Sequence, residues 1–260
     1  MDKKQQVALL LFDLDGTLLR SDKTISARTV NTLNKCKEKG ILIGISTSRA
    51  IHNCVTLLPD LKPDLFIASG GAVIEYRGEY IFTSEFSEEE TRELIDAARE
   101  ICGDCEIAVD TLDAHYWNYK INPNEKAANW GDTTYTDFAD FNAKSLKISV
   151  EIPEAEKAEQ LAARFPDCDF HKFVGNDWYK FSKKNATKEN AIHFASAALS
   201  LDLSDAAAFG DDIADIGMLK LCGTGVAMGN AIDAVKEAAD VVIGSNDEDG
   251  IAEYLEKYVL

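Results

Sequence analysis

The sequence is poor in positive charge: its 260 residues carry 27 lysines and arginines against 45 aspartates and glutamates, which gives a net charge of −18. A surface this acidic repels the phosphates of nucleic acids and of anionic lipids, so we expect neither as a partner. It also repels a small anionic substrate, unless a cation and local basic side chains reverse the field inside the binding site.

Paired cysteines and long apolar runs are also missing. Of the six cysteines only Cys102 and Cys105 lie close together, and a zinc site needs a second such pair, so we expect free thiols in a reducing cytosol. The apolar run near the N-terminus is short and ends in acids, which predicts a strand and not a signal peptide. No segment is long and apolar enough to span a bilayer. These absences predict a cytoplasmic protein without a membrane partner. We expect a monomer or a weak homo-oligomer.

Buried strands and amphipathic helices alternate in the two outer parts of the chain. Residues 6–15 form an apolar run, as in a strand that is buried on both faces. Residues 41–49 predict a second buried strand, which ends in small polar residues. The intervening residues 25–40 have helical spacing and end at a glycine. The same alternation resumes at about residue 184. The pattern predicts an α/β fold with a doubly wound, Rossmann-like parallel-sheet core formed by residues 1–82 and 184–260.

The pattern changes near residue 83. Ser87 and Glu90 have the spacing of a capping box at the start of a helix. After this helix the strands alternate apolar and polar residues, as strands with one buried face do. We therefore expect residues 83–183 to form a separate α/β cap domain, an open sheet with helices on one face, inserted between the two halves of the core.

Polar side chains follow four of the predicted core strands. They are Asp13 and Asp15 after the first strand, Ser46 to Arg49 after the second, Ser69 to Gly71 after the third, and Asp211, Asp212 and Asp215 after a fourth. Ligands of open parallel sheets bind at the carboxyl ends of the strands. One such end is ordinary turn chemistry, but four in one sheet predict a binding site. Lys188 opens a helix of the same domain.

These residue types suit phosphoryl transfer. Clustered carboxylates need a counter-charge, and oxygen ligands at the end of a rigid sheet suit Mg²⁺ together with a substrate phosphate. A hydroxyl, backbone amides and a lysine suit the phosphoryl oxygens. A carboxylate can attack phosphorus to form an aspartyl-phosphate, and a second acid two residues along can exchange a proton with the leaving oxygen.

Four motifs carry a resemblance to a known family: FDLDGTL (residues 12–18), STSR (46–49), TK (187–188) and GDDIADIGML (210–219). In this order they resemble the haloacid dehalogenase-like (HAD) superfamily of aspartyl-phosphate phosphatases. GVAMGNA (225–231), SNDEDGIAEYL (245–255) and the place of the insert are similar to its Cof-type branch. The resemblance implies a Mg²⁺-dependent hydrolase of sugar phosphates or related small phosphorylated metabolites.

The resemblance also implies roles for individual residues. Asp13 is the expected nucleophile and Asp15 the expected general acid and base. The expected ligands of Mg²⁺ are Asp13, the main-chain carbonyl of Asp15, Asp211 and Asp215. Thr47, the backbone amide of Ser48 and Lys188 are expected to hold the phosphoryl group. The expected supporting residues are Asp212, Arg49, Gly70, Gly71 and Asn230.

The chain departs from the family pattern at two places, and two alternative functions stay open. Ala214 replaces a common asparagine, and Gly70-Gly71 replaces Asn-Gly. One alternative is a metabolite sensor built on an inactive phosphatase, and the substitution at Ala214 supports it. A phosphosugar mutase would need a basic pocket in the cap, which Lys120, Lys126, Lys144 and Lys147 do not clearly form.

Plainer interpretations of single residues also stay open. The acids at 211, 212 and 215 suit the N-terminus of a helix, Thr47 suits a strand end, and Lys188 suits a solvated first turn. The candidate substrate contacts in the insert, which are also ordinary core residues, are His115, Tyr116, Trp117, Trp130, Trp178 and Tyr179.

Overall fold

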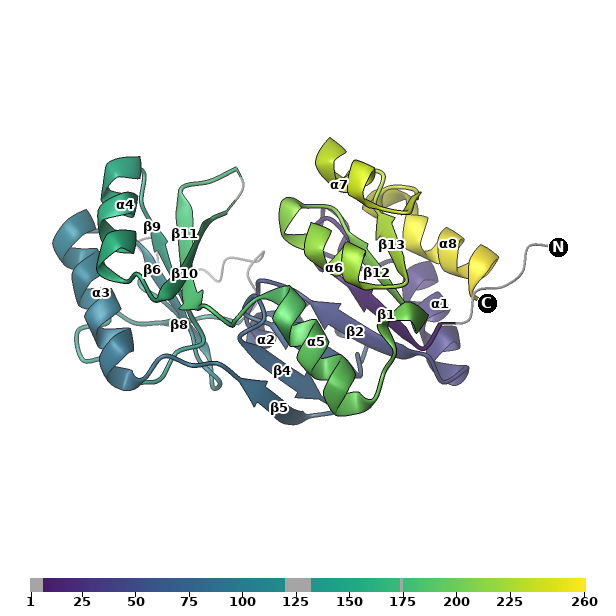
Figure 1. Cartoon of the computed structure of the whole chain (residues 1–260), viewed down its shortest axis with the longest axis horizontal. Helices are drawn as coiled ribbons and strands as arrows, with labels where there is room; N and C mark the ends of the chain where they lie inside the picture. Colours follow the sequence, from purple (N-terminus) through teal and green to yellow (C-terminus); the bar gives the residue numbers. More distant parts are fainter. Residues whose placement is uncertain (1–6, 120–131, 174) are drawn as a thin grey trace.

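The structure, a computed structural model, describes residues 7–119, 132–173 and 175–260, and within them the chain forms two sheets with their helices (Figure 1). Each sheet has its own hydrophobic cluster. We call the larger sheet with its helices the core and the smaller one the cap. The domain boundaries at residues 83 and 184 stay a prediction; β5 of the core ends at Thr83 and α5 begins at Lys188.

The core sheet has eight strands. From one edge to the other they are β14 (Val241–Val242), β13 (Thr224–Ala227), β12 (Ala206–Gly210), β1 (Leu9–Phe12), β2 (Leu42–Ser46), β3 (Leu65–Ala68), β4 (Val73–Tyr76) and β5 (Glu79–Thr83). The strands from β14 to β3 are parallel, and β4 and β5 extend the sheet as an antiparallel hairpin.

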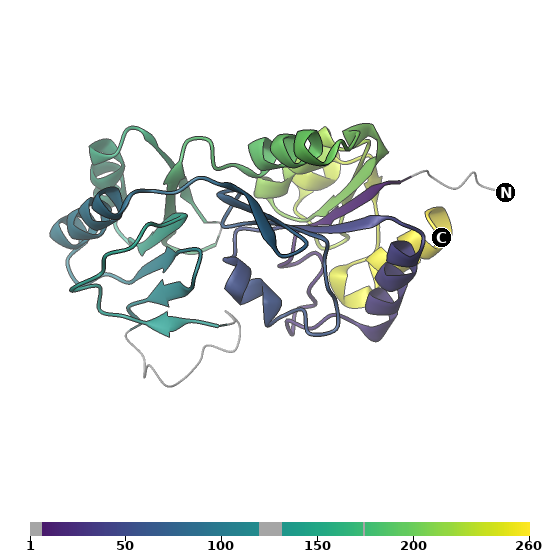
Figure 2. The same ribbon diagram turned by 90° about the horizontal axis from the view of Figure 1, so that it is seen from below.

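Helices cover both faces of the core sheet. They are α1 (Ala27–Glu38), α2 (Ile51–Val55), α5 (Lys188–Leu199), α6 (Ile216–Leu221), α7 (Asp233–Ala238) and α8 (Gly250–Tyr258), with the short 3₁₀ helices η1 (Leu203–Asp205), η2 (Ile213–Asp215) and η3 (Asn246–Glu248). Figure 2 shows α1 and α8 on one side of the sheet and α5 and α6 on the other. The predicted doubly wound α/β fold is therefore confirmed.

The central strands form because their residues are apolar on both sides. All four residues of β1 are buried, and Phe12 stacks on its register partner Phe209 of β12 with 4.6 Å between the ring centroids. A strand between two helical layers has no solvent-facing side, which is why this run is continuous and not alternating.

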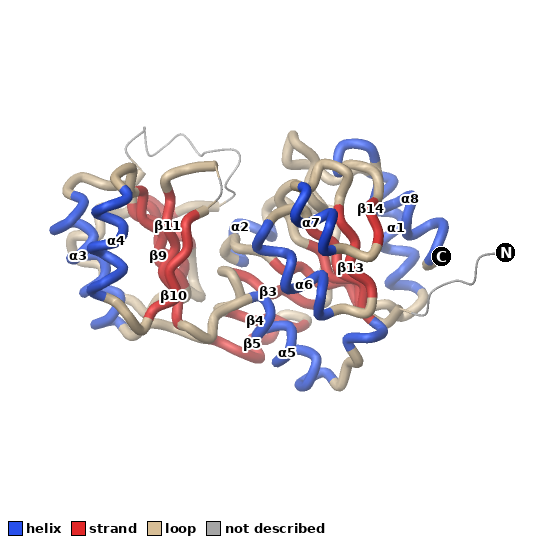
Figure 3. Tube along the Cα trace, turned by 45° about the horizontal axis from the view of Figure 1, so that its top comes forward, coloured by secondary structure: helices blue, strands red, loops and turns tan. Residues whose placement is uncertain are grey.

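The cap sheet is mainly antiparallel and carries its two helices on one face. Its strand order is β10 (Cys168–Lys172), β11 (Trp178–Lys183), β9 (Lys147–Glu151), β6 (Ile107–Asp110), β7 (His115–Trp117) and β8 (Thr134–Tyr135). The helices α3 (Glu88–Cys102) and α4 (Ala155–Arg164) lie on the face turned away from the core (Figures 1 and 3).

Two predictions on the cap have different outcomes. The capping box of α3 is confirmed, with Ser87 and Glu90 bonded to each other's backbone N–H. The prediction that the strand around Ile107–Asp110 has one polar face is wrong, because all four residues are buried. The second face of β6 is covered by the core, where Asp110 accepts a hydrogen bond from Ser69.

In the described part of the chain no helix has the length and apolar character needed to cross a bilayer.

The turn between β3 and β4 brings the core loops close together. Gly71 has a φ of +103°, and a Cβ there would lie 2.2 Å from the main-chain oxygen of Thr187. Gly78, in the β4–β5 hairpin, has a φ of +88° and no atom within 4 Å of a Cβ. The two glycines share the left-handed backbone, but only Gly71 needs the space.

We therefore expect Gly71→Ala to destabilise the protein more than Gly78→Ala. Both variants carry the backbone strain, so the difference reports the clash with Thr187, about 1–3 kcal/mol for overpacking. The midpoints of urea unfolding of the two variants measure it. Equal midpoints would mean that the segment carrying Thr187 moves away at little cost.

Candidate active site

The four strand ends singled out from the sequence lie side by side. β12, β1, β2 and β3 are neighbours in the sheet and run parallel, so their carboxyl ends share one edge. A cavity of about 540 Å³ lies at this edge, between core and cap. The predicted site residues that line it are Asp13, Asp15, Thr47, Ser48, Arg49, Lys188, Asp212 and Asp215.

A buried lysine joins two of the acids. Lys188 Nζ lies 2.7 Å from Asp13 Oδ1 and 2.8 Å from Asp215 Oδ1. Burial would lower the pKa of Lys188, but the two carboxylates raise it well above its usual value. Burial also raises the pKa of Asp13, against the opposing effect of Lys188. Lys188 is thus a buried cation between two carboxylates, and not a solvated lysine in the first turn of α5.

Asp211 adds a third carboxylate. One oxygen each of Asp13, Asp211 and Asp215 lies within 4.8 Å of the others. Thr17 donates a hydrogen bond to Asp211 at 2.6 Å, and burial, opposed by this hydrogen bond, raises the pKa of Asp211 to about 6. Asp215 accepts from the backbone N–H groups of Asp211 and Asp212, which fixes the loop. Three carboxylates against one lysine leave negative charge, and oxygen ligands in this arrangement suit a hard divalent cation.

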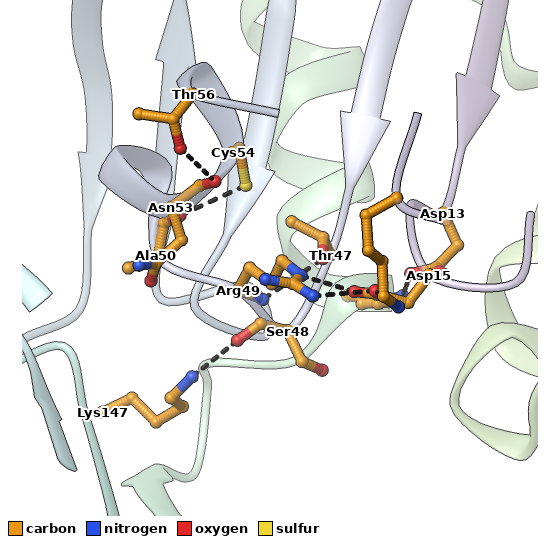
Figure 4. Close-up of polar contacts among 12 residues, drawn as sticks. Asp13, Asp15, Thr47, Ser48, Arg49, Ala50, Asn53, Cys54, Thr56 and Lys147 are labelled. Carbon is orange, nitrogen blue, oxygen red and sulfur yellow. Dashed lines mark hydrogen bonds and ion pairs between the residues drawn. The ribbon is translucent and has the colours of Figure 1, made fainter. Parts of the chain in front are cut away.

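Asp15 is held by two bases. Arg49 contacts it in a bidentate pair, with Nε 2.5 Å from Oδ2 and Nη2 2.8 Å from Oδ1 (Figure 4). Lys23 Nζ lies 2.7 Å from Oδ1. Burial would raise the pKa of Asp15, but Arg49 and Lys23 lower it below its usual value. Sequence reasoning missed Lys23, because it lies in a loop with no motif around it.

The remaining core candidates organise the loops. Thr47 is buried, and its hydroxyl accepts a hydrogen bond from the Arg49 N–H at 3.2 Å. Gly70 donates from its N–H to the Thr47 carbonyl at 3.0 Å. Asn230 donates to the Gly16 carbonyl at 2.8 Å. Gly70, Gly71, Asn230 and Asp211 are not among the residues that line the cavity.

The cap supplies the other wall of the cavity. Three of the candidate substrate contacts, His115, Trp117 and Trp178, line it, and Lys147 lines it as well. Tyr116 and Tyr179 instead pack on cap phenylalanines, and Trp130, Lys120 and Lys126 fall outside the described residues. The lining residues missed from the sequence are Lys23, Ala50, Asn53, Ala108, Ser149, Phe173 and Asn176.

The chain matches a model of the haloacid dehalogenase-like hydrolases over residues 10–255. This match spans both the core and the cap. The protein therefore belongs to this family, and its enzyme class is that of the family's phosphatases.

Three relatives illustrate the similarity. The putative phosphatase YkrA of Bacillus subtilis is 29% identical, over 97% of this chain and 96% of its own. The 5-amino-6-(5-phospho-D-ribitylamino)uracil phosphatase YcsE of the same organism is also 29% identical, over 98% and 96%. The solved structure of the HAD subclass IIB sugar phosphatase BT4131 superposes with a TM-score of 0.79 at 26% identity and covers 96% and 98% of the two chains.

The raised pKa of Asp211 predicts how cation binding depends on pH. A divalent cation would bind the ionised carboxylate of Asp211, so protons would compete with it below about pH 6. We expect the association constant for Mg²⁺ to fall by about tenfold for each pH unit below 6. In the metal-free protein, the pKa of Asp211 is higher in the folded chain than in the unfolded chain. Protonation of Asp211 therefore stabilises the fold at low pH, and this contribution to the free energy of unfolding is lost as the pH rises through about 6.

Titration calorimetry with Mg²⁺ at pH 5, 6 and 7 measures this dependence. Asp211→Asn should bind weakly at every pH, whereas Asp212→Asn, outside the three-carboxylate group, should keep the dependence. An affinity of the wild-type protein that is the same at pH 5 and 7 would contradict the prediction.

Proposed function

We propose that the protein is a Mg²⁺-dependent phosphatase that hydrolyses small phosphomonoesters, sugar phosphates or related metabolites, through an aspartyl-phosphate. The observation that carries this proposal is the placement of Asp13 in the cavity, beside a buried lysine and the acids that follow β12, with Asp15 two residues away. Membership of the haloacid dehalogenase-like hydrolases supports it.

The proposed roles fall to residues that line the cavity and to Asp211, which lies close to Asp13 and Asp215. A carboxylate oxygen of Asp13 attacks phosphorus in line with the leaving oxygen, and the P–O bond to the leaving group breaks. Lys188, the Thr47 hydroxyl and the Ser48 amide bind the phosphoryl oxygens and offset their charge. Bound Mg²⁺, held by Asp13, the Asp15 carbonyl, Asp211 and Asp215, would neutralise further negative charge on these oxygens.

Asp15 moves the proton in both half-reactions. It protonates the leaving alcohol and then takes a proton from the water that attacks the phosphorus of the aspartyl-phosphate. Its ion pairs with Arg49 and Lys23 favour the deprotonated carboxylate, which suits the second step. The first step requires that substrate binding loosen at least one of these ion pairs, so that the carboxyl group can carry a proton.

The cavity supports a small leaving group. Its volume of about 540 Å³ suits a metabolite, and the rings of Trp117 and Trp178 offer apolar surface of the kind that packs on sugar faces. YcsE and BT4131 are named as phosphatases of a ribityl phosphate and of sugars. A cytoplasmic location and a monomeric or weakly associated state stay predictions.

The two alternatives receive less support from the site. A mutase needs cations for a second phosphate, and among the described cap residues the lysine that lines the cavity, Lys147, is already paired with Asp110. A sensor needs a disabled centre, yet Asp13, Asp15 and Lys188 share one cavity here.

Asp13→Asn tests the mechanism. The amide is a poor nucleophile, so we expect turnover of an aryl phosphate to fall by about 10³-fold or more. The assay compares the wild-type protein with Mg²⁺ and with EDTA, and the variant with Asp60→Asn, an exposed aspartate, as a matched control. Turnover by Asp13→Asn at the wild-type rate would exclude the aspartyl-phosphate route.

Ala214→Asn tests the departure from the family pattern. Ala214 lines the cavity, and an amide there can donate to a phosphoryl oxygen, a charged acceptor worth about 1.5–3 kcal/mol. We expect kcat/KM to rise by about tenfold, with the exposed cap substitution Ala163→Asn as control. An unchanged kcat/KM would mean that the asparagine amide does not reach the phosphoryl group in this site.

A further inference from the structure

Three side chains lie opposite one another at one end of the cap sheet. Asp110 of β6 pairs in register with Lys147 of β9 and with His115 of β7. Lys147 Nζ lies 2.8 Å from Asp110 Oδ2, and His115 Nδ1 lies 2.7 Å from Oδ1. Burial of Asp110 is complete and opposes ionisation, but Lys147 and His115 hold its pKa well below its usual value. The cap therefore buries an ionised pair at its border with the core.

The same pair reaches across this border. Lys147 Nζ donates a hydrogen bond to the main-chain oxygen of Ser48 at 2.6 Å (Figure 4). Asp110 Oδ2 accepts one from the Ser69 hydroxyl at 2.8 Å. Ser48 follows β2 and Ser69 follows β3, so each member of the pair holds a different core loop.

The two core loops are also bonded to each other. The Ser69 N–H donates to the Arg49 carbonyl at 2.7 Å, and the Gly70 N–H donates to the Thr47 carbonyl at 3.0 Å. Ser69 adopts a φ of +50°, a backbone conformation that a non-glycine residue keeps only where neighbours fix it. The cap thus contacts one bonded unit, and this unit carries Thr47, Ser48 and the arginine that holds Asp15.

We infer that Lys147 is a positioning residue that couples the docking of the cap to the phosphoryl-binding loop, and that Asp110 keeps its ammonium group in place. This inference rests on the proposed function, because it takes Thr47 and the Ser48 amide as the groups that bind the phosphoryl oxygens. The hydrogen bond from Lys147 to the carbonyl oxygen of Ser48 fixes the peptide group between Ser48 and Arg49. The phosphoryl site is complete only when the cap that surrounds the leaving group is docked.

Lys147→Met removes the contact to Ser48 and leaves Asp110 as an unbalanced buried charge, which destabilises the fold. The double variant Lys147→Met, Asp110→Asn keeps the charge balance and removes the same contact. Lys157→Met is the matched control, since Lys157 is a cap lysine that pairs with Glu154 on the surface. All three are compared with the wild-type protein.

We expect kcat/KM of the single and double variants to fall on the order of tenfold to a hundredfold, because a displacement of binding groups by about 1 Å has an effect of this size. The constant for competitive inhibition by inorganic phosphate should rise by a similar factor, because phosphate has no leaving group for the cap to contact. Lys157→Met should keep both wild-type values. A folded double variant with unchanged phosphate inhibition would overturn the inference.

Hydrogen–deuterium exchange separates this inference from the proposed function. The amides of residues 47–49 and 69–71 should exchange faster in the double variant than in the wild-type protein and in Lys157→Met. Faster exchange supports the coupling even if the wild-type protein shows no turnover, in which case only the proposed function fails. Unchanged exchange at both loops overturns the coupling, whatever the turnover.

Discussion

The site depends on one buried cation. Lys188 reaches Asp13 across 175 positions of the chain and Asp215 across 27, so this contact forms only when both halves of the core have folded together. Each carboxylate is tolerable in a buried position because the ammonium group is there, and the reverse also holds. The other acids at this edge of the sheet depend on the same contact. Asp215 accepts hydrogen bonds from two backbone N–H groups of the loop after β12. This loop places Asp211 close to Asp13 and Asp215.

The core could be predicted from the sequence because its signals are local. An apolar run such as Leu9–Phe12 predicts a strand buried on both faces, whatever its neighbours are. Parallel strands place all their carboxyl ends at one edge, so polar residues after each run converge without any knowledge of side-chain geometry. The sequence therefore predicts that Asp13, Thr47 and Asp215 lie at one edge of the sheet, and all three line the cavity there, although no two of them are adjacent in the sequence.

The ion pair on the cap side of the site could not be predicted, because its signal is not local. Asp110 and Lys147 lie in short apolar segments that indicate only strands. They face each other because β6 and β9 pair in one particular register, and a shift of one residue would turn each side chain to the other face. Lys23 was missed for a related reason, since its approach to Asp15 depends on the course of a loop. The contacts between the two sheets depend on packing that periodicity does not encode.

The charge of the cavity explains how an acidic protein can bind an anionic substrate. The chain as a whole has a net charge of −18, but the residues that line the cavity include four acids and four bases: Asp13, Asp15, Asp212, Asp215, Lys23, Arg49, Lys147 and Lys188. The cavity wall is therefore balanced within an acidic molecule, and one bound divalent cation would make it positive. An anionic ester gains from this field only inside the cavity, where the fixed groups of the core are the same for any phosphoryl group. Discrimination between esters then falls to the cap, whose wall contributes the rings of Trp117 and Trp178 and the lysine Lys147.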